Sequence, residues 1–205
     1  GRSVAVSRGT DQPQTAADSG LTHRRVVVKV GTNLLAAGAP SLDGTEMSRI
    51  VAQIAALRAR GGEAILVSSG AIEAGRGRLR DADAGGDLPH DLHRDQVLAA
   101  VGQSRLMSLW DERFEAAGIT TAQALLTRTD LADRLGYLNA RNTLLDLLKL
   151  RVVPIVNEND VVSVEEIENS VIGDNDNLSA LVANLVDADL LLLLTATAGL
   201  HTANP

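Results

Sequence analysis

Lysine is scarce in this sequence, which makes the position of each lysine informative. The chain has 17 arginines but only two lysines, Lys29 and Lys149. Because arginine supplies positive charge almost everywhere else, a retained lysine indicates a need for its compact ammonium group, which a planar guanidinium cannot imitate. Lys149 falls near the expected C-terminal end of a helix, where a cation is favourable for structural reasons alone. Lys29 is therefore the stronger candidate for chemistry.

The residues that follow Lys29 suit a phosphate group. Gly31 lets the backbone approach a ligand closely, and the hydroxyl of Thr32 can donate a hydrogen bond. An ammonium group beside them would balance the negative charge of a phosphoryl group. The alternative is that Lys29 only extends into solvent from the end of a strand.

A second candidate site is the segment Ser68-Ser69-Gly70-Ala71, which leads directly into an expected helix. The free N–H groups at a helix start bind anions, and a glycine there lets the ligand come close. The segment therefore suits a carboxylate or a phosphate. The alternative is an ordinary serine cap at the start of a helix.

Two further segments concentrate amides and carboxylates, Asn157 to Asp160 and Gly173 to Asn177. Such groups can hold an ammonium, a carboxylate and a charged lysine together, although Asn and Asp are also common in turns, and Asp176 or Asn177 could simply cap the next helix. A calcium loop is excluded because leucines occupy its fifth and twelfth positions if Asp174 is the first ligand.

The elements that must position these residues are five apolar runs separated by segments of helical periodicity. The runs are Val26–Val30, Ala64–Val67, Ile119–Leu125, Val152–Val156 and Leu190–Leu194. Continuous apolar runs are typical of strands buried on both faces of a parallel sheet. Pro154 is unexpected in a strand because proline lacks the N–H donor. We expect an α/β fold, a three-layer α/β/α sandwich with a mainly parallel sheet.

Helical periodicity separates the expected strands. One helix has its apolar face at Met47 to Leu57, and a second is marked by the leucines before Lys149. Gln96–Ala117 and Leu178–Val186 are expected to form two more, and the polar stretch Arg80–Asp95 is expected to be a long loop or lid. In parallel α/β sheets, ligands bind beyond the carboxyl ends of the strands. Four candidate segments fall there: Lys29 to Asn33, Ser68 to Ala71, Asn157 to Asp160, and Thr195.

Composition excludes several classes of protein. The net charge of −7 and the presence of only three aromatic residues argue against nucleic-acid binding, and no apolar stretch approaches the roughly 20 residues of a membrane span. Without cysteine there is no disulfide or thiolate metal site, and the four histidines are scattered, so no protein metal site is expected. The polar first 22 residues are expected to be a disordered tail preceding a single domain over 23–205.

Read in order, the motifs resemble the glutamate 5-kinase family of the amino-acid kinase superfamily. The similar stretches include VVVKVGTNLL, LVSSGAIEAGRGRL, LAAVGQSRLMSLWDERF, NARNTL, VVPIVNENDVVSVEEI and GDNDNLSAL. The resemblance implies a carbamate kinase-like α/β/α fold and synthesis of γ-glutamyl phosphate from glutamate and ATP with Mg²⁺, the first step of proline synthesis. It also implies a cytoplasmic location, feedback inhibition by proline and a homo-oligomer.

The resemblance also implies roles for individual residues. Lys29, Asp174 and Asp176 correspond to catalytic positions. The positions implied for glutamate binding are Ser69, Gly70, Ala71, Asn157, Asp160 and Asn175, and those implied for ATP binding are Lys29, Gly31, Thr32, Thr195 and Ala196.

The last segment departs from the family pattern. Ala196, His201 and Asn204 stand where the pattern has Asp, Tyr and Asp, which weakens the expectation of a nucleotide contact at Ala196. The resemblance predicts that the kinase domain continues beyond Pro205 with a glycine-rich loop that carries a second lysine. Two alternatives stay open, a non-catalytic fragment that binds glutamate or proline, and a kinase for a related acidic amino acid.

Overall fold

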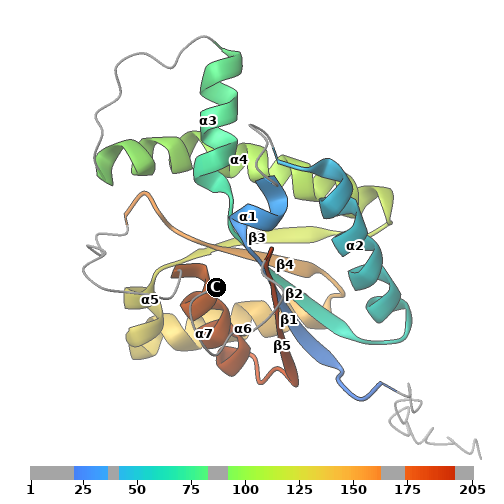
Figure 1. The fold of residues 1–205 in the computed structure, drawn as a ribbon. Helices are drawn as coiled ribbons and strands as arrows, with labels where there is room; N and C mark the ends of the chain where they lie inside the picture. Colours follow the sequence, from blue (N-terminus) through green and yellow to red (C-terminus); the bar gives the residue numbers. More distant parts are fainter. Residues whose placement is uncertain (1–20, 37–41, 83–91, 163–173, 197–205) are drawn as a thin grey trace, which may run out of the picture.

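The structure is a computed structural model that describes residues 21–36, 42–82, 92–162 and 174–196 (Figure 1). Its centre is a five-stranded sheet in the order β3-β4-β2-β1-β5, and every neighbouring pair is parallel. The strands are β1 (Arg25–Val30), β2 (Glu63–Ser68), β3 (Thr121–Leu126), β4 (Val153–Glu158) and β5 (Leu190–Leu194). Each of the five predicted strands is therefore confirmed, with bounds that shift by one or two residues for all but the last.

Helices connect consecutive strands. They are α1 (Thr32–Ala36), α2 (Gly44–Ala59), α3 (Ala71–Asp81), α4 (Leu92–Ala116), α5 (Arg128–Ala132), α6 (Arg134–Lys149) and α7 (Asp174–Leu185). Side chains define two of the starts, because the carboxylates of Asp43 and Asp133 accept hydrogen bonds from first-turn N–H groups of α2 and α6. Thr127 and Asp130 form a capping box at the start of α5.

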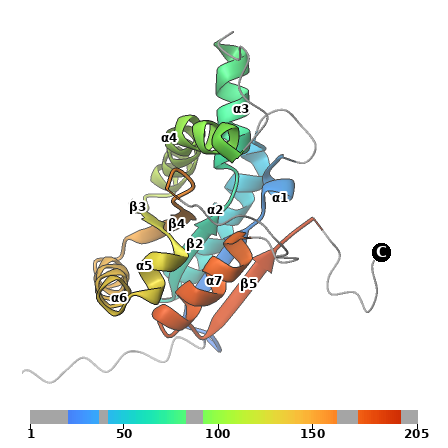
Figure 2. The ribbon, with the colours of Figure 1, turned by 90° about the vertical axis from the view of Figure 1, so that its left-hand side faces the viewer.

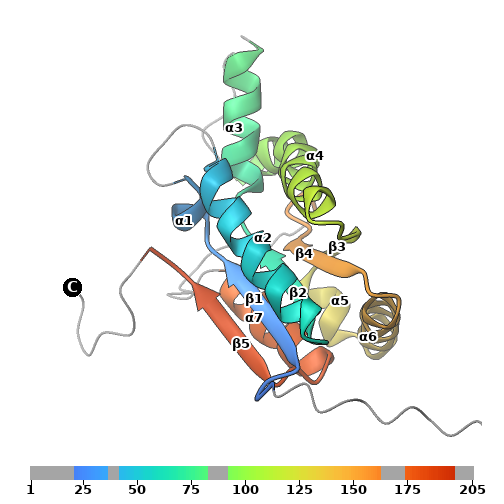
Figure 3. The same ribbon diagram turned by 90° about the vertical axis from the view of Figure 1, so that its right-hand side faces the viewer.

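The apolar side chains form two clusters, one on each face of the sheet. Because side chains alternate along a strand, Val26, Val28 and Val30 pack with α2 and α4, whereas Val27 packs with α6 and α7. Figures 2 and 3 show the two helical layers on opposite sides of the sheet, with α3 extending away from it. The predicted three-layer α/β/α fold is confirmed.

Pro154 lies inside β4, which is not an edge strand. The N–H of the preceding Val153 donates to Thr120 on the β3 side, so the missing N–H of Pro154 falls on the opposite side, toward β2. The pairing of β4 with β2 begins only at Ile155. The proline is tolerated because no ladder partner stands opposite its nitrogen.

Three predicted boundaries were wrong. α7 begins at Asp174, four residues before the predicted start, so Asn175 and Asp176 belong to its first turn. α3 and α4 occupy both ends of the predicted loop Arg80–Asp95, because amphipathic turns extend into that polar stretch; positions 83–91 lie outside the described residues. The predicted tail also lies outside the described residues, except for its last two positions.

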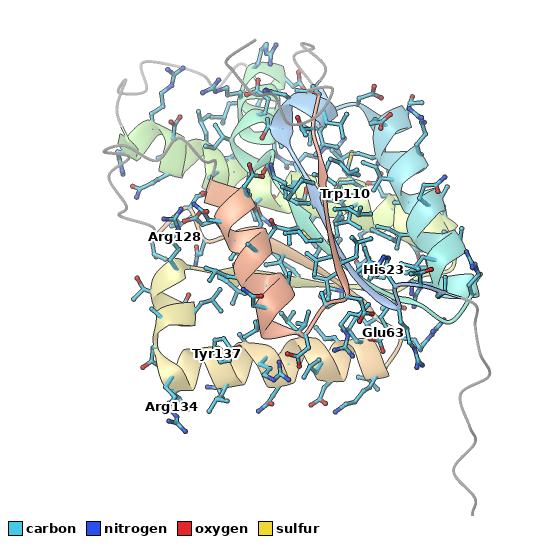
Figure 4. All side chains as sticks on the ribbon, turned by 60° about the horizontal axis from the view of Figure 1, so that its bottom comes forward. His23, Glu63, Trp110, Arg128, Arg134 and Tyr137 are labelled. Atoms are coloured by element: carbon cyan, nitrogen blue, oxygen red, sulfur yellow. The ribbon has the colours of Figure 1, made fainter. Side chains whose placement is uncertain are left out.

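A buried hydrogen bond links α4 to the end of β2. The indole Nε1 of Trp110 donates to Ser68 Oγ over 2.8 Å, and both side chains are fully buried. Figure 4 shows Trp110 within the layer between α4 and the sheet, with Tyr137 on the other helical layer. The bond holds α4 beside the turn from β2 into α3. None of the helices in the described parts of the chain has the length and apolar character needed to cross a membrane.

Candidate functional site

A cavity of about 610 Å³ opens at the carboxyl ends of the strands, as expected for a parallel α/β sheet. Residues from widely separated parts of the sequence line it. The predicted site residues among them are Lys29, Gly31, Thr32, Ser69, Gly70, Ala71, Asn157, Asp160, Asn175, Asp176, Thr195 and Ala196. Asp174 is the first residue of α7, and its side chain lies outside the described part of the structure.

Lys29 points into this cavity on the α7 side of the sheet. It lies two residues after Val27, so the alternation of a strand places both side chains on the same face. There its Nζ forms an ion pair of 2.6 Å with Asp176 Oδ1 in the first turn of α7. The lysine side chain is only 12% exposed, whereas Asp176 is 35% exposed. The alternative, in which Lys29 only extends into solvent, is therefore wrong, because Asp176 and the first turn of α7 lie over its ammonium.

Gly31 fits closely between Lys29 and β5. Its N–H donates to the carbonyl of Leu194 over 3.2 Å. A Cβ at this position would lie 3.3 Å from Lys29 Nζ, which is a tight contact. The glycine thus keeps the ammonium close to the backbone that lines the cavity.

The turn between β2 and α3 presents backbone donors to the same cavity. Gly70 is the residue before α3 and has a φ of 110°, a left-handed conformation that favours glycine. Glycine has no side chain to cap the helix, and no side-chain capping bond is present at this end. The first N–H groups of α3 therefore face the cavity at Ala71 and Ile72, which suits an anion.

Amide and hydroxyl side chains connect three elements beneath the cavity. Asn175 Nδ2 of α7 donates to Ser69 Oγ over 2.8 Å and to Asn157 Oδ1 over 3.1 Å. Asn157 Nδ2 in turn donates to Gln103 Oε1 of α4 over 2.7 Å. The structure therefore brings three of the predicted glutamate-binding residues into one network and adds a fourth residue, Gln103. Sequence reasoning missed Gln103, although it stands in one of the stretches that resemble the family.

Two carboxylates at the end of β4 and just after it also line the cavity. Asp160 was predicted, whereas Glu158 was treated only as part of its polar segment; Glu158 is 7% exposed at the end of β4. β4 extends two residues beyond the predicted run, which places Asn157 and Glu158 on opposite faces of the sheet. The alternation could have identified Glu158 if the strand end had been known.

Charges of both signs thus surround one small cavity. One cation, a helix start and several hydrogen-bond acceptors lie within reach of a ligand, an arrangement that suits a zwitterion with additional negative charge. No group of three or more potential metal-ligating side chains occurs within the described ranges. His23 and Glu63 lie at the opposite, amino ends of β1 and β2 (Figure 4).

The sequence of the chain is similar to those of known proteins. Residues 24–205 match the model of the amino acid kinase family. The chain is 54% identical over 187 residues to a glutamate 5-kinase of Dehalococcoides mccartyi, covering 91% of this chain and 49% of the relative. It is 53% identical over 182 residues to the glutamate 5-kinase of an Azoarcus species, covering 89% of this chain and 47% of the relative. The chain therefore spans about half the length of the curated relatives it matches.

A solved structure is similar in fold. The carbamate kinase of Giardia superposes with a TM-score of 0.56 at 16% sequence identity, covering 86% of this chain and 76% of that one. At this identity the similarity concerns the fold, and it agrees with the parallel sheet and two helical layers described above.

Proposed function

The chain belongs to the amino acid kinase family, and from this premise we propose that it carries the glutamate-binding and phosphoryl-transfer site of a glutamate 5-kinase, which makes γ-glutamyl phosphate from glutamate and ATP. The observation that carries the proposal is the cavity itself. It joins the ammonium of Lys29 to Ser69, Asn157, Asp160 and Asn175. The identity of 52–54% to relatives named glutamate 5-kinase supports the choice of substrate.

The reaction needs charge neutralisation more than proton transfer. The side-chain carboxylate of glutamate has a pKa near 4.3 in water, so it is already a nucleophile at neutral pH and needs no general base. The obstacle is repulsion between this carboxylate and the triphosphate. A nearly buried ammonium such as that of Lys29 attracts both anions and so offsets their repulsion. This attraction is stronger where water is excluded. This accounts for a site built without histidine among its described lining residues.

The three charged groups of glutamate can each find a partner in the cavity. We assign the α-carboxylate to the N–H groups at the start of α3, next to Gly70 and Ala71. The ammonium pairs with Asp160 and with the Asn175 side chain. The γ-carboxylate then points toward Lys29, where Asp176 keeps the lysine oriented in the absence of ligand.

ATP is proposed to bind next to Lys29, with its phosphates near Gly31 and Thr32. Thr195 and Ala196 directly follow β5 and line the same cavity, so they are proposed to contact the nucleotide, Ala196 through its backbone only. Mg²⁺ keeps most of its ligands from water and substrate phosphates, with one or two protein carboxylates. We therefore treat it as part of the Mg-ATP substrate, with Asp176 and Asp174 as the acidic residues that organise this side of the site.

Other parts of the proposal follow from the family resemblance. They are a role in proline synthesis, inhibition by proline, homo-oligomerisation and a cytoplasmic location.

Glutamate-dependent release of ADP from Mg-ATP tests the proposed function. The chain should release ADP with glutamate and much less with aspartate, whose side chain is one methylene shorter. A preference for aspartate would favour a kinase for another acidic amino acid. Calorimetric binding of glutamate without any ADP release would favour the non-catalytic alternative. No observation in the cavity favours that alternative.

A further inference from the structure

The amide network beneath the cavity has a defined polarity. Gln103 Oε1 accepts from Asn157 Nδ2, so the Oδ1 of Asn157 faces Asn175 and accepts from its Nδ2. The same Nδ2 donates its second hydrogen to Ser69 Oγ. Both donors of Asn175 are thereby used within the protein.

Each end of this network leaves one buried polar atom without a partner among the described residues, the Nε2 donor of Gln103 and the Oδ1 acceptor of Asn175. Asn175 Oδ1 is buried and has no hydrogen-bond partner among the described residues. A buried amide oxygen without a partner is costly, so the position is suited to accept a hydrogen bond from a ligand. Asn175 lines the cavity, and the ammonium of an amino acid is a donor of the required kind.

The opposite polarity would select a different ligand group. If Gln103 presented its Nε2 to Asn157, Asn157 would have to reverse, and Asn175 would reverse with it. Asn175 would then offer N–H donors to the cavity, which suit a carboxylate rather than an ammonium. The orientation of Gln103, which does not line the cavity, therefore determines which group the cavity presents.

The packing of α4 places Gln103 where it can set this polarity. A Cβ on the neighbouring Gly102 would lie 1.8 Å from the carbonyl oxygen of Ala71 and 2.3 Å from the nitrogen of Gly75. Only glycine permits α4 to cross α3 this closely. This close crossing brings Gln103 within hydrogen-bond distance of Asn157. It also places α4 against the first turn of α3, which lines the same cavity.

We propose that Gln103 is a positioning residue for substrate recognition: its side-chain carbonyl fixes the Asn157–Asn175–Ser69 network so that Asn175 Oδ1 accepts from the ammonium of the amino-acid substrate. This inference rests on the proposed function, because it takes the ligand to be an amino acid. Gln103 would thus influence substrate specificity without touching the substrate, through its hydrogen bond to Asn157 and the bond from Asn175 to Asn157.

Two substitutions of similar size distinguish polarity from packing. Gln103→Met keeps the length of the side chain but cannot accept the hydrogen bond from Asn157 Nδ2, so it cannot fix the orientation of that amide. Gln103→Glu has acceptors only, so it enforces the polarity seen in the structure. Ser104→Ala, on the exposed neighbouring position of α4, is the matched control. Calorimetry on the 205-residue chain would give Kd for glutamate, for Mg-ATP and for glutarate, which has both carboxylates but no ammonium.

We expect Gln103→Met to raise the Kd for glutamate about tenfold, the loss of one hydrogen bond to a charged group. The Kd values for glutarate and Mg-ATP should stay within twofold of those of the parent chain, and Gln103→Glu should recover most of the affinity for glutamate. Thermal unfolding of each variant identifies any loss of fold. If Gln103→Met does not fold, the Kd of Gln103→Glu for glutamate, compared with that of the parent chain, is the deciding measurement.

Other outcomes would overturn the inference. An unchanged Kd for glutamate in Gln103→Met, or an equal weakening of glutarate, would exclude recognition of the ammonium through this network. A greater loss of glutamate affinity in Gln103→Glu than in Gln103→Met would indicate the opposite polarity. Failure of the parent chain to bind glutamate would instead overturn the proposed function.

Discussion

We expect Lys29→Met to abolish phosphoryl transfer without weakening the fold, whereas Asp176→Asn should destabilise it. The reason is the unequal burial of the ion pair, in which the lysine is 12% exposed and the aspartate 35% exposed. Removing the aspartate charge leaves a nearly buried ammonium without its partner. Removing the lysine charge leaves a carboxylate that water still reaches.

The magnitudes follow from this asymmetry. Breaking a fully buried pair costs about 3–5 kcal/mol, and the partial exposure of Asp176 reduces this to roughly 1–2 kcal/mol for Asp176→Asn. Lys29→Met leaves Asp176 as the unpaired charge, and this carboxylate is 35% exposed and stays hydrated, so the free energy of unfolding should change by less than about 1 kcal/mol.

Urea unfolding at pH 7 measures both effects. Lys149→Met is the matched control, because this lysine is 74% exposed and pairs with Asp146 on the surface. We expect it to alter the free energy of unfolding by less than about 0.5 kcal/mol and to leave ADP release unchanged. If Lys29→Met destabilises the chain more than Asp176→Asn does, Lys29 is retained for the fold and our reasoning about its function fails.

Three further predictions concern the site and its support. Lys29→Arg should lower kcat for phosphoryl transfer roughly 100- to 1,000-fold, because a planar guanidinium cannot imitate the compact ammonium that lies close to Gly31; a kcat within threefold of the parent would contradict this. Asp160→Asn should raise the KM for glutamate about tenfold or more and that for ATP little, whereas equal changes would remove Asp160 from the glutamate pocket. Hydrogen bonds from the backbone N–H groups of Arg25 and Arg24 lower the pKa of the Asp189 carboxyl in the folded chain. The ionised carboxylate therefore stabilises the fold at pH values above its pKa in the unfolded chain, near 4, and this stabilisation is lost as the pH falls through the lower pKa of the folded chain. Asp189→Asn should therefore lower the urea midpoint by about 0.3 M at pH 7, and this difference should shrink as the pH falls below about 4; a pH-independent difference would refute the explanation.

The strands and most of the site were predictable because both depend on local patterns. Continuous apolar runs such as Leu190–Leu194 are readable without knowledge of the fold. In a parallel sheet the carboxyl ends meet at one edge, so the residues after each run could be expected to gather. The cavity contains twelve of the thirteen predicted site residues; the side chain of the remaining one, Asp174, lies outside the described part.

The start of α7 was not predictable from local patterns. Asn175 and Asp176 have low helix propensity and are as compatible with a cap as with a first turn. Their position in the helix depends on tertiary contacts, namely the bond from Asn175 to Ser69 and the ion pair from Asp176 to Lys29.

Gln103 was not predictable for a different reason. It is 54 residues from Asn157 in sequence and belongs to a helix whose apolar positions are explained by packing on the sheet. Its contact with Asn157 depends on the close crossing of α3 and α4 at Gly102. A single sequence shows neither the crossing nor the polarity of the amide network.

The most direct test of the proposed function is the identity of the phosphorylated product. Incubation of the chain with glutamate, Mg-ATP and hydroxylamine should give γ-glutamyl hydroxamate, because hydroxylamine traps an acyl phosphate formed on the side chain. The product should be absent without ATP or without glutamate and should fall at least 100-fold with Lys29→Arg. Hydroxamate formation that does not depend on Lys29, or none from a chain that binds both glutamate and Mg-ATP, would contradict the assignment of this cavity as the phosphoryl-transfer site.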